Sequence, residues 1–315
     1  MTAPRSRLHQ LLLAGEFVVT TELPTTDSAD PASVLEIARG LKGRVDAVNC
    51  TDNSAAHPHL AGIAAAHLLQ DAGLEPILQF TCRDRNRLAL QADLLGAAAL
   101  GVPNVCLMTG DDVSAGDHPD AKPIYDIDSI QLLRTARVMR DGGTYLSGRP
   151  LATPPSFLIG AVENPFAPPL EFRPTRLGKK IEAGAEFFQT QICFDVPRLR
   201  LFLSRAADLG LLEAAPIIVG VFVPKTARGA RYLRDQVPGI DLPEPVIDRI
   251  DAAPTEAQHD VGVRIAVEIV EEVRGLEGVS GVHLMAIRNE EGIHRVLEDA
   301  GLLPRPEPVG TVAVG

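Results

Sequence analysis

Short apolar runs alternate along the chain with longer segments in which apolar residues recur every three or four positions. A continuous apolar run bounded by turn residues is typical of a strand buried on both faces of a parallel sheet, whereas the longer spacing indicates an amphipathic helix. Residues 105–108 show the first pattern, because they follow Pro103 and give way to Thr109-Gly110-Asp111-Asp112. Strands of this kind are predicted at residues 17–21, 45–48, 76–80, 105–108, 156–162, 187–190, 217–223 and 279–287.

A helical segment follows each predicted strand. The expected helices are 30–41, 58–72, one ending at Leu100, 127–140, 176–183, one beginning at Asp195, 227–235 and 291–300, with further helices inserted in 238–275 before the last strand. This repeated strand–helix series predicts an α/β protein, a parallel (β/α)₈ TIM barrel. An open doubly wound sheet is the alternative, but it would usually carry a glycine-rich fingerprint after the first strand, where this chain has Glu22-Leu23-Pro24-Thr25.

Domain organisation follows from the same pattern. No linker interrupts the series, so residues 1–302 are expected to form a single barrel domain. From Gly301 onward the chain carries Pro304, Pro306 and Pro308 and reads as a frayed end, so residues 303–315 are expected to be a flexible C-terminal tail.

Composition and charge narrow the functional classes. The chain has 315 residues, 45% of them apolar, and a net charge of −11. An acidic surface repels phosphate backbones and anionic lipid headgroups, so neither nucleic acid nor a membrane is an expected partner. No apolar run is long enough to cross a bilayer, and the apolar stretch near the N-terminus is too short for a signal peptide. We therefore expect a cytoplasmic protein.

Metal and nucleophile chemistry have little support in the sequence. Cys50, Cys82, Cys106 and Cys193 form no Cys-x-x-Cys pair and are expected to be buried free thiols. His57 and His59 lie two residues apart, where they would point to different faces of a helix, and no third ligand has suitable spacing. A Gly-x-Ser-x-Gly elbow is also missing from the sequence.

The predicted strand ends carry a polar set of residues. In a parallel barrel these C-terminal ends converge on one mouth, which is where such folds place their chemistry. Carboxylates and amides at that mouth suit a flat heterocycle with donors and acceptors around its edge, such as a pterin. The strand-end residues are Glu22, Asn49, Gln79, Thr109 with Asp111, Glu163, Gln191, Phe222 and Arg288-Asn289.

Two ionisable positions admit both a functional and a structural interpretation. Glu22 is predicted to lie deepest, among Val19, Leu23 and the strand tips, where a raised pKa would let it donate a proton near neutral pH. The alternative is a carboxylate held by backbone groups or an arginine. Lys180, in the Lys179-Lys180 pair, could attract a phosphate or a glutamate tail, but most such pairs are solvated helix residues.

Several of these segments together resemble the methylenetetrahydrofolate reductase family, over roughly residues 16–302. The family's glutamate followed by proline is matched by Glu22-Leu23-Pro24, its Leu-Thr-Cys by Phe80-Thr81-Cys82, and its Arg-Gly-Asp by Thr109-Gly110-Asp111. Its Lys-x-Asp-Ala-Gly-Ala and Thr-Gln-x-x-Phe-Asp motifs are matched by residues 180–185 (Lys-Ile-Glu-Ala-Gly-Ala) and 190–195 (Thr-Gln-Ile-Cys-Phe-Asp).

The resemblance implies a (β/α)₈ barrel that reduces 5,10-methylenetetrahydrofolate to 5-methyltetrahydrofolate with electrons from NADH or NADPH. Glu22 resembles the acid that protonates the bridging nitrogen, which opens the ring to a methylene iminium. Asp111 resembles the aspartate beside the pterin, whose charge would stabilise that cation. Gln191 resembles the glutamine that binds the pterin edge, and Asn49, Phe222 and Asn289 are further candidates for substrate binding.

The departures from the family pattern fall on its flavin contacts. Thr109 replaces an arginine, Gln79 a histidine, and Val162-Glu163-Asn164-Pro165 replaces Tyr-Pro-Glu-x-His. The second strand's Thr-aromatic-Gly-Ala becomes Asn49-Cys50-Thr51-Asp52. Because arginine is the natural partner of a flavin phosphate or a reduced, anionic flavin ring, these changes make FAD doubtful. Gln79, Thr109, Glu163 and Lys180 are the candidate cofactor-binding residues.

The resulting hypothesis is a divergent reductase that transfers hydride directly from NADH or NADPH to the iminium, without bound flavin. Three alternatives stay open: an FAD-dependent ping-pong reductase, a pterin-binding methyltransferase barrel and a non-catalytic folate-binding paralogue. The folate and the nicotinamide are the expected small-molecule partners.

Overall fold

Eight parallel strands close into a barrel in the part of the chain that the computed structural model describes, residues 3–237 and 239–307. Each strand pairs with the next in chain order, and β8 returns to β1 through the register Val19 to Val282. The predicted barrel is therefore confirmed. The strands are β1 (Val18–Glu22), β2 (Ala47–Cys50), β3 (Pro76–Thr81), β4 (Asn104–Met108), β5 (Leu158–Glu163), β6 (Phe187–Ile192), β7 (Ile217–Phe222) and β8 (Val279–Met285).

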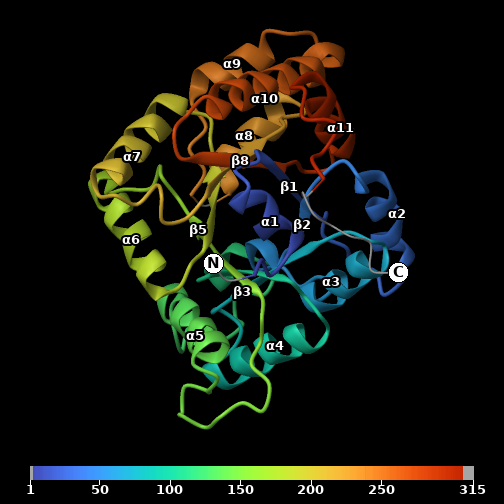
Figure 1. Cartoon of the computed structure of the whole chain (residues 1–315). Helices are drawn as coiled ribbons and strands as arrows, with labels where there is room; N and C mark the ends of the chain where they lie inside the picture. The colour runs from blue at the N-terminus through green and yellow to red at the C-terminus, as the bar shows by residue number, and fades with distance from the viewer. Residues whose placement is uncertain (1–2, 238, 308–315) are drawn as a thin grey trace.

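Helices surround the strands, as Figure 1 shows. Five of the α-helices in the described residues begin with a capping side chain: for example, the Asn86 side chain accepts hydrogen bonds from the backbone N–H groups of Leu88 and Ala89, and Asp128 forms a capping box with Gln131. The helices are α1 (Arg7–Leu13), α2 (Ala32–Leu41), α3 (Gly62–Asp71), α4 (Arg87–Ala99), α5 (Ser129–Asp141), α6 (Arg173–Ala183), α7 (Val196–Asp208), α8 (Ala227–Gln236), α9 (Glu244–Asp251), α10 (Gln258–Arg274) and α11 (Glu290–Asp299).

Element boundaries differ from the sequence prediction by a few residues. The second strand runs from Ala47 to Cys50 rather than over 45–48, so Asn49 lies inside the strand, opposite Glu22 in the sheet register. The inserted helices expected in 238–275 are α9 and α10. Among the described residues, no helix is long and apolar enough to cross a membrane.

A small apolar cluster fills the barrel interior near the N-terminal ends of the strands. It joins residues from each of the strands β1 to β7, including Val18, Ile77 and Phe187, to Leu8 and Leu11 of α1. A Cβ at Gly160 would lie 2.2 Å from the Phe187 ring, so a glycine is needed where this ring crosses the interior. A larger cluster lies between the strands and the outer helices. Because this end of the interior is filled, space for a ligand remains toward the C-terminal ends of the strands.

Helix α1, to which the sequence analysis assigned no structure, closes the N-terminal end of the barrel and lies near the centre of the view in Figure 1. The Ser6 hydroxyl accepts a hydrogen bond from the backbone N–H of His9 at 2.9 Å, which starts the helix. Leu8 and Leu11 share one face by their spacing and are 0% and 1% exposed. The helix is short, and its burial on the barrel stabilises it more than its intrinsic propensity does.

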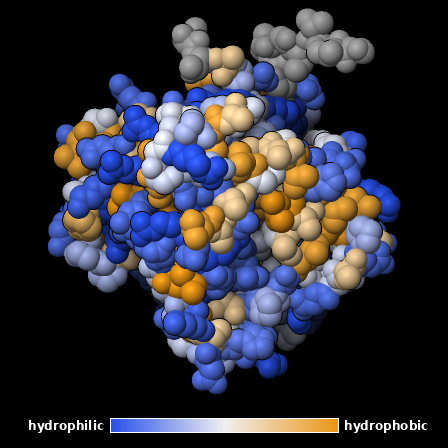
Figure 2. Space-filling view, turned by 90° about the horizontal axis from the view of Figure 1, so that it is seen from below, coloured by the Kyte–Doolittle hydropathy of each residue, from blue (hydrophilic) through white to orange (hydrophobic). Residues whose placement is uncertain are grey.

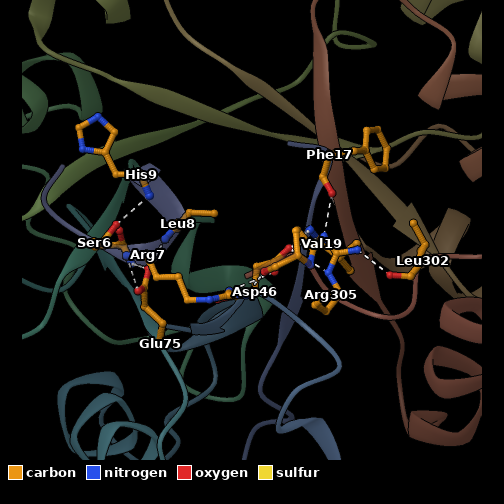
Figure 3. A network of polar contacts seen from close by, with 12 residues as sticks. Ser6, Arg7, Leu8, His9, Phe17, Val19, Asp46, Glu75, Leu302 and Arg305 are labelled. Carbon is orange, nitrogen blue, oxygen red and sulfur yellow. Dashed lines mark hydrogen bonds and ion pairs between the residues drawn. The ribbon is translucent and has the colours of Figure 1, made fainter. Parts of the chain in front are cut away.

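A polar network at the same end holds the two ends of the chain (Figure 3). The Asp46 carboxylate accepts hydrogen bonds from the backbone N–H of Val19 at 2.7 Å, from Arg7 at 3.1 Å and from Arg305 at 2.6 Å. Glu75 accepts from the backbone N–H groups of Arg7 and Leu8. In the expected C-terminal tail, Arg305 is bound to the buried Asp46 carboxylate and the Pro306 carbonyl accepts a hydrogen bond from Arg7. Residues 308–315 lie outside the described residues, so the tail as a whole stays a prediction.

The outer surface is mostly hydrophilic, with scattered hydrophobic patches on the face drawn in Figure 2. Exposed large apolar side chains include Leu13, Leu201 and Tyr232, which come from α1, α7 and α8. Single exposed apolar residues are ordinary on soluble surfaces. The concave, polar end of the barrel is therefore the better place to look for function.

Candidate active site

A cavity of about 400 Å³ opens at the C-terminal ends of the strands. Strands β1 to β6 and β8, or the loops that follow them, contribute to its wall, together with α6. All the sequence-predicted site residues except Phe222 and Asn289 line it. The lining residues discussed below are Glu22, Asn49, Asp52, Gln79, Arg83, Thr109, Asp111, Glu163, Arg173, Arg176, Lys180, Gln189, Gln191 and His283.

Phe222 and Asn289 are absent from the described cavity lining. Phe222 is 7% exposed and belongs to the core cluster between strands and helices. Asn289 is 2% exposed, and its side-chain nitrogen donates to the carbonyl of Val223 at 3.2 Å. In this structure both residues pack the rim between β7 and β8, and their predicted role in substrate binding stays a prediction.

Glu22 lies at the end of β1 beside an imidazole. Its Oε1 is 3.7 Å from Nε2 of His283, and the two side chains are 35% and 4% exposed. The surroundings expected from the sequence were apolar, but the carboxylate faces a buried histidine and remains partly open to the cavity. A carboxyl group placed in this way can exchange a proton with a ligand on one side and be oriented by the imidazole on the other.

A chain of buried hydrogen bonds fixes that histidine. Asn49 and Gln189 exchange two amide hydrogen bonds, at 2.7 and 3.0 Å. The other hydrogen of the Gln189 amide is directed to the Thr20 hydroxyl at 3.2 Å, and this hydroxyl contacts His283 Nδ1 at 2.8 Å. The Gln189 amide nitrogen, which can only donate, also lies 3.4 Å from Nδ1, so we assign Nδ1 as an acceptor and direct the Thr20 proton to it. The His283 proton then sits on Nε2, the nitrogen that faces Glu22.

Thr20, Gln189 and His283 were missed by sequence reasoning, although a signal for them was available. Thr20 lies two residues before Glu22, and Gln189 two residues before Gln191. Side chains two apart in a strand point to the same face, so each lies one layer deeper in the barrel than a predicted strand-end residue. The prediction stopped at the strand tips and did not extend one layer inward.

Gln191 and Asp111 present polar groups from neighbouring parts of the mouth. Gln191 Oε1 accepts a hydrogen bond from the backbone N–H of Ile192 at 2.9 Å, and its amide nitrogen makes no hydrogen bond with any residue in the described part of the chain. Asp111 follows Gly110, whose φ of +88° favours glycine and where a Cβ would lie 2.9 Å from Thr81 Cβ. The Asp111 carbonyl accepts a hydrogen bond from the Tyr125 hydroxyl at 2.8 Å, so the turn is held while the carboxylate stays exposed.

Glu163 and Lys180 form a buried ion pair across β5 and α6. Lys180 Nζ lies 2.6 Å from Glu163 Oε2, with side chains 5% and 1% exposed, and Nζ also donates to the carbonyl of Val162. Burial lowers the pKa of the Lys180 ammonium, and the charge of Glu163 opposes that shift. Arg173 approaches the other Glu163 oxygen at 3.8 Å. The lysine charge is therefore balanced inside the protein.

The described residues offer no site for metal binding or for a reactive thiol. No group of three His, Cys, Asp or Glu side chains in that part of the chain could hold a metal ion. His57 and His59 contact Asp117 and Asp27 instead, at 3.4 and 2.6 Å. All four cysteines are buried, and burial raises the pKa of the Cys106 thiol to about 12. A thiol held protonated in this way is a poor nucleophile.

A closed (β/α)₈ barrel with carboxylates and amides around the C-terminal mouth defines the chain as a barrel protein with a polar cavity at that mouth. A family model described as methylenetetrahydrofolate reductase matches residues 7–301, and the chain belongs to this family.

Curated relatives named as methylenetetrahydrofolate reductases match the chain at low sequence identity. Methylenetetrahydrofolate reductase 2 of Schizosaccharomyces pombe is 25% identical over 247 residues, and a probable methylenetetrahydrofolate reductase (NADPH) of Caenorhabditis elegans is 22% identical over 244 residues. Each match covers 76% of this chain, but the chain spans 38% and 34% of the length of these two relatives.

Solved structures share the fold. An uncharacterized protein from Clostridium thermocellum that binds two copies of 5-methyl-5,6,7,8-tetrahydrofolic acid has a TM-score of 0.64 and 16% identity, covering 95% of this chain and 99% of its own. DmoA from Hyphomicrobium sulfonivorans has a TM-score of 0.57 and 8% identity, covering 93% of this chain and 89% of its own. At these identities the likeness concerns the fold.

Proposed function

We propose that this protein reduces 5,10-methylenetetrahydrofolate to 5-methyltetrahydrofolate with hydride taken directly from NADH or NADPH. The observation that carries the proposal is that Glu22, Asp111 and Gln191 line one cavity although they come from β1, the loop after β4 and β6. Family membership supports the same reaction, and the Clostridium thermocellum neighbour binds the methylated folate that would be its product.

Glu22 supplies the proton in this proposal. Protonation of the bridging nitrogen breaks its bond to the methylene carbon and leaves an iminium cation on the other nitrogen. The ionised Glu22 that results is next to the Nε2–H of His283, which can stabilise the carboxylate. His283 thus acts as a positioning residue, and the buried Gln189 and Thr20 contacts hold it in place.

Asp111 and Gln191 act on the pterin and its cation. The exposed Asp111 carboxylate provides a negative charge near the mouth, where it would stabilise the iminium before hydride arrives. Gln191, which lines the cavity, can donate from its amide nitrogen to a pterin carbonyl or ring nitrogen. Transfer of hydride to the iminium carbon completes the methyl group, and the nicotinamide leaves oxidised.

The residues at the family's flavin-contact positions fit a flavin poorly. Thr109 and Gln79 carry no charge. Lys180 is already bound to Glu163 and to the Val162 carbonyl, so no cation at these positions is available to an anionic flavin ring. This disagreement supports hydride transfer without flavin, because a nicotinamide can deliver hydride itself if both substrates share the cavity.

The test combines an absorbance spectrum of the purified protein with nicotinamide oxidation in the presence and absence of added FAD. We expect a colourless protein that oxidises NADH or NADPH when methylenetetrahydrofolate is present, at a rate that FAD does not change. Stoichiometric bound FAD, or turnover that requires it, would reject the flavin-free mechanism. Turnover that depends on a corrinoid acceptor and consumes no nicotinamide would favour a methyltransferase.

A further inference from the structure

The positive charges around the cavity are not equally available to a ligand. Four Arg and Lys side chains line it: Arg83, Arg173, Arg176 and Lys180. Arg83 binds Asp84 through Nε at 2.7 Å and Nη2 at 2.8 Å, and Lys180 binds Glu163. These two cations therefore have acid partners within the protein and add little net attraction for an anion.

Arg173 is likewise held by the protein. Its Nε donates to the carbonyl of Ala167 at 2.7 Å and its Nη2 to the carbonyl of Pro168 at 2.8 Å, while Nη1 faces Glu163. Arg176 lies one helical turn further along α6, on the same side as Arg173. Its guanidinium makes no hydrogen bond or ion pair with any residue in the described part of the chain, yet it lines the cavity and is only partly exposed.

The acidic side chains of the cavity also differ in whether they have partners within the protein. Asp52 is held by the hydroxyl and backbone N–H of Thr81 and by Arg85. Among the described residues, Glu22 has His283 as its one ion-pair contact and Asp111 has none. In the closed barrel β1, which carries Glu22, stands four strands away from β5, against whose Glu163 helix α6 packs, whereas β4, which precedes Asp111, is next to β5. The cavity therefore has unbalanced negative charge at Glu22 and Asp111 and unbalanced positive charge at Arg176.

We infer that Arg176 is an oxyanion-recognition residue that binds the charged end of a substrate and so orients it across the mouth. This inference rests on the proposed function, in which the reacting centre becomes cationic near Glu22 and Asp111 while both substrates carry anionic groups elsewhere. A guanidinium offers a planar fork of donors that matches a carboxylate or a phosphate with two hydrogen bonds. The shared ligand chemistry is an oxyanion, either the dinucleotide diphosphate or the glutamate carboxylates of the folate.

The experiment compares Arg176→Ala and Arg176→Lys with a matched control, Arg134→Ala. Arg134 is an exposed arginine of the neighbouring helix α5 that lies outside the cavity lining. For each variant the KM of the nicotinamide and the KM of mono- and triglutamyl methylenetetrahydrofolate are measured separately, together with kcat. Circular dichroism and thermal melting establish that the variants are folded.

We expect Arg176→Ala to raise one KM roughly tenfold or more, as loss of a charge-assisted hydrogen bond does, with a smaller effect on kcat. Arg176→Lys should recover part of this loss, and Arg134→Ala should leave every constant within about twofold. A rise confined to the nicotinamide assigns Arg176 to the diphosphate. A rise in the folate KM that grows with glutamate number assigns it to the tail. Unchanged KM values, or equal effects in Arg134→Ala, would overturn the inference.

Direct binding separates this inference from the proposed reaction. Dissociation constants of NADH, NADPH and 5-methyltetrahydrofolate are measured by calorimetry on the wild type and on Arg176→Ala. If the wild type binds these molecules but catalyses no reduction, the reductase proposal is rejected. The ratio of the Kd of Arg176→Ala to that of the wild type then decides the role of Arg176. A Kd ratio below about twofold for all three would reject that role.

Discussion

Removal of one charge from the buried Glu163–Lys180 pair should destabilise the protein strongly. In Glu163→Gln the Lys180 ammonium keeps the Val162 carbonyl but loses its acid partner, at a place where its side chain is 5% exposed. Breaking a buried pair in this way typically costs about 3–5 kcal/mol, because one charge stays buried without compensation. With an unfolding entropy of roughly 2.1 cal/mol/K per residue, a chain of 315 residues should lose about 5–8 °C in Tm.

The pH dependence of the stability of Glu163→Gln provides a second, independent test. Burial lowers the folded pKa of Lys180 below its ordinary value of 10.5, so between the two values the folded state binds fewer protons than the unfolded chain and stability rises with pH. Glu163 opposes the lowering, and its removal lowers the folded pKa further and widens that window. The stability deficit of Glu163→Gln should therefore shrink as the pH rises toward the ordinary lysine value.

Differential scanning calorimetry at pH 7 and pH 9 measures both effects. The matched control is Glu163→Leu combined with Lys180→Met, which removes both charges and should recover much of the lost Tm. The reasoning would be refuted if the single variant lost less than about 1 kcal/mol, if its deficit were the same at both pH values, or if the double variant were as unstable as the single one.

Three further predictions concern other parts of the molecule. Glu22→Gln should lower kcat about 10²- to 10⁴-fold while the Kd of 5-methyltetrahydrofolate changes little, and a variant that kept most of its rate would refute the acid assignment. His283→Ala should lower kcat while the Kd of 5-methyltetrahydrofolate changes little, because Glu22 loses the group that orients it, whereas an unchanged kcat would mean that the histidine serves packing alone. Asp46→Ala, which leaves Arg305 and Arg7 without their acid, should cost about 3–5 kcal/mol in urea denaturation with activity retained below the transition, and a loss below about 1 kcal/mol would contradict its role.

The barrel was predictable because its strands are mostly buried on both faces and are therefore rich in apolar residues. Strand β7, Ile-Ile-Val-Gly-Val-Phe with every residue buried, is the clearest case. Helix α1 was missed because seven residues with two buried leucines have no strong signal until the barrel floor is there to receive them. The contact between Arg305 and Asp46 was not predictable for a related reason, because the two residues meet only once the barrel has closed.

The mouth was predictable as far as the strand tips, because each tip is a local sequence feature. Glu22, Asp111 and Gln191 were placed together on that basis, and the structure brings them to one cavity. Pairings between distant elements were not predictable: the sequence contains Glu163 and Lys180 but does not show that they neutralise each other. The same limit applies to Arg176, whose significance depends on which neighbouring cations already have partners.

The central claim is that hydride passes from the nicotinamide to the folate carbon without an intermediate carrier. A single turnover in ordinary water with NADH or NADPH deuterated at the transferred position, followed by mass spectrometry of the methyl group, tests it most directly. Direct transfer predicts one deuterium per methyl group, because a hydride that moves from carbon to carbon does not exchange with solvent. Loss of the label to water, as expected when a reduced flavin nitrogen holds the hydrogen in between, would contradict the account.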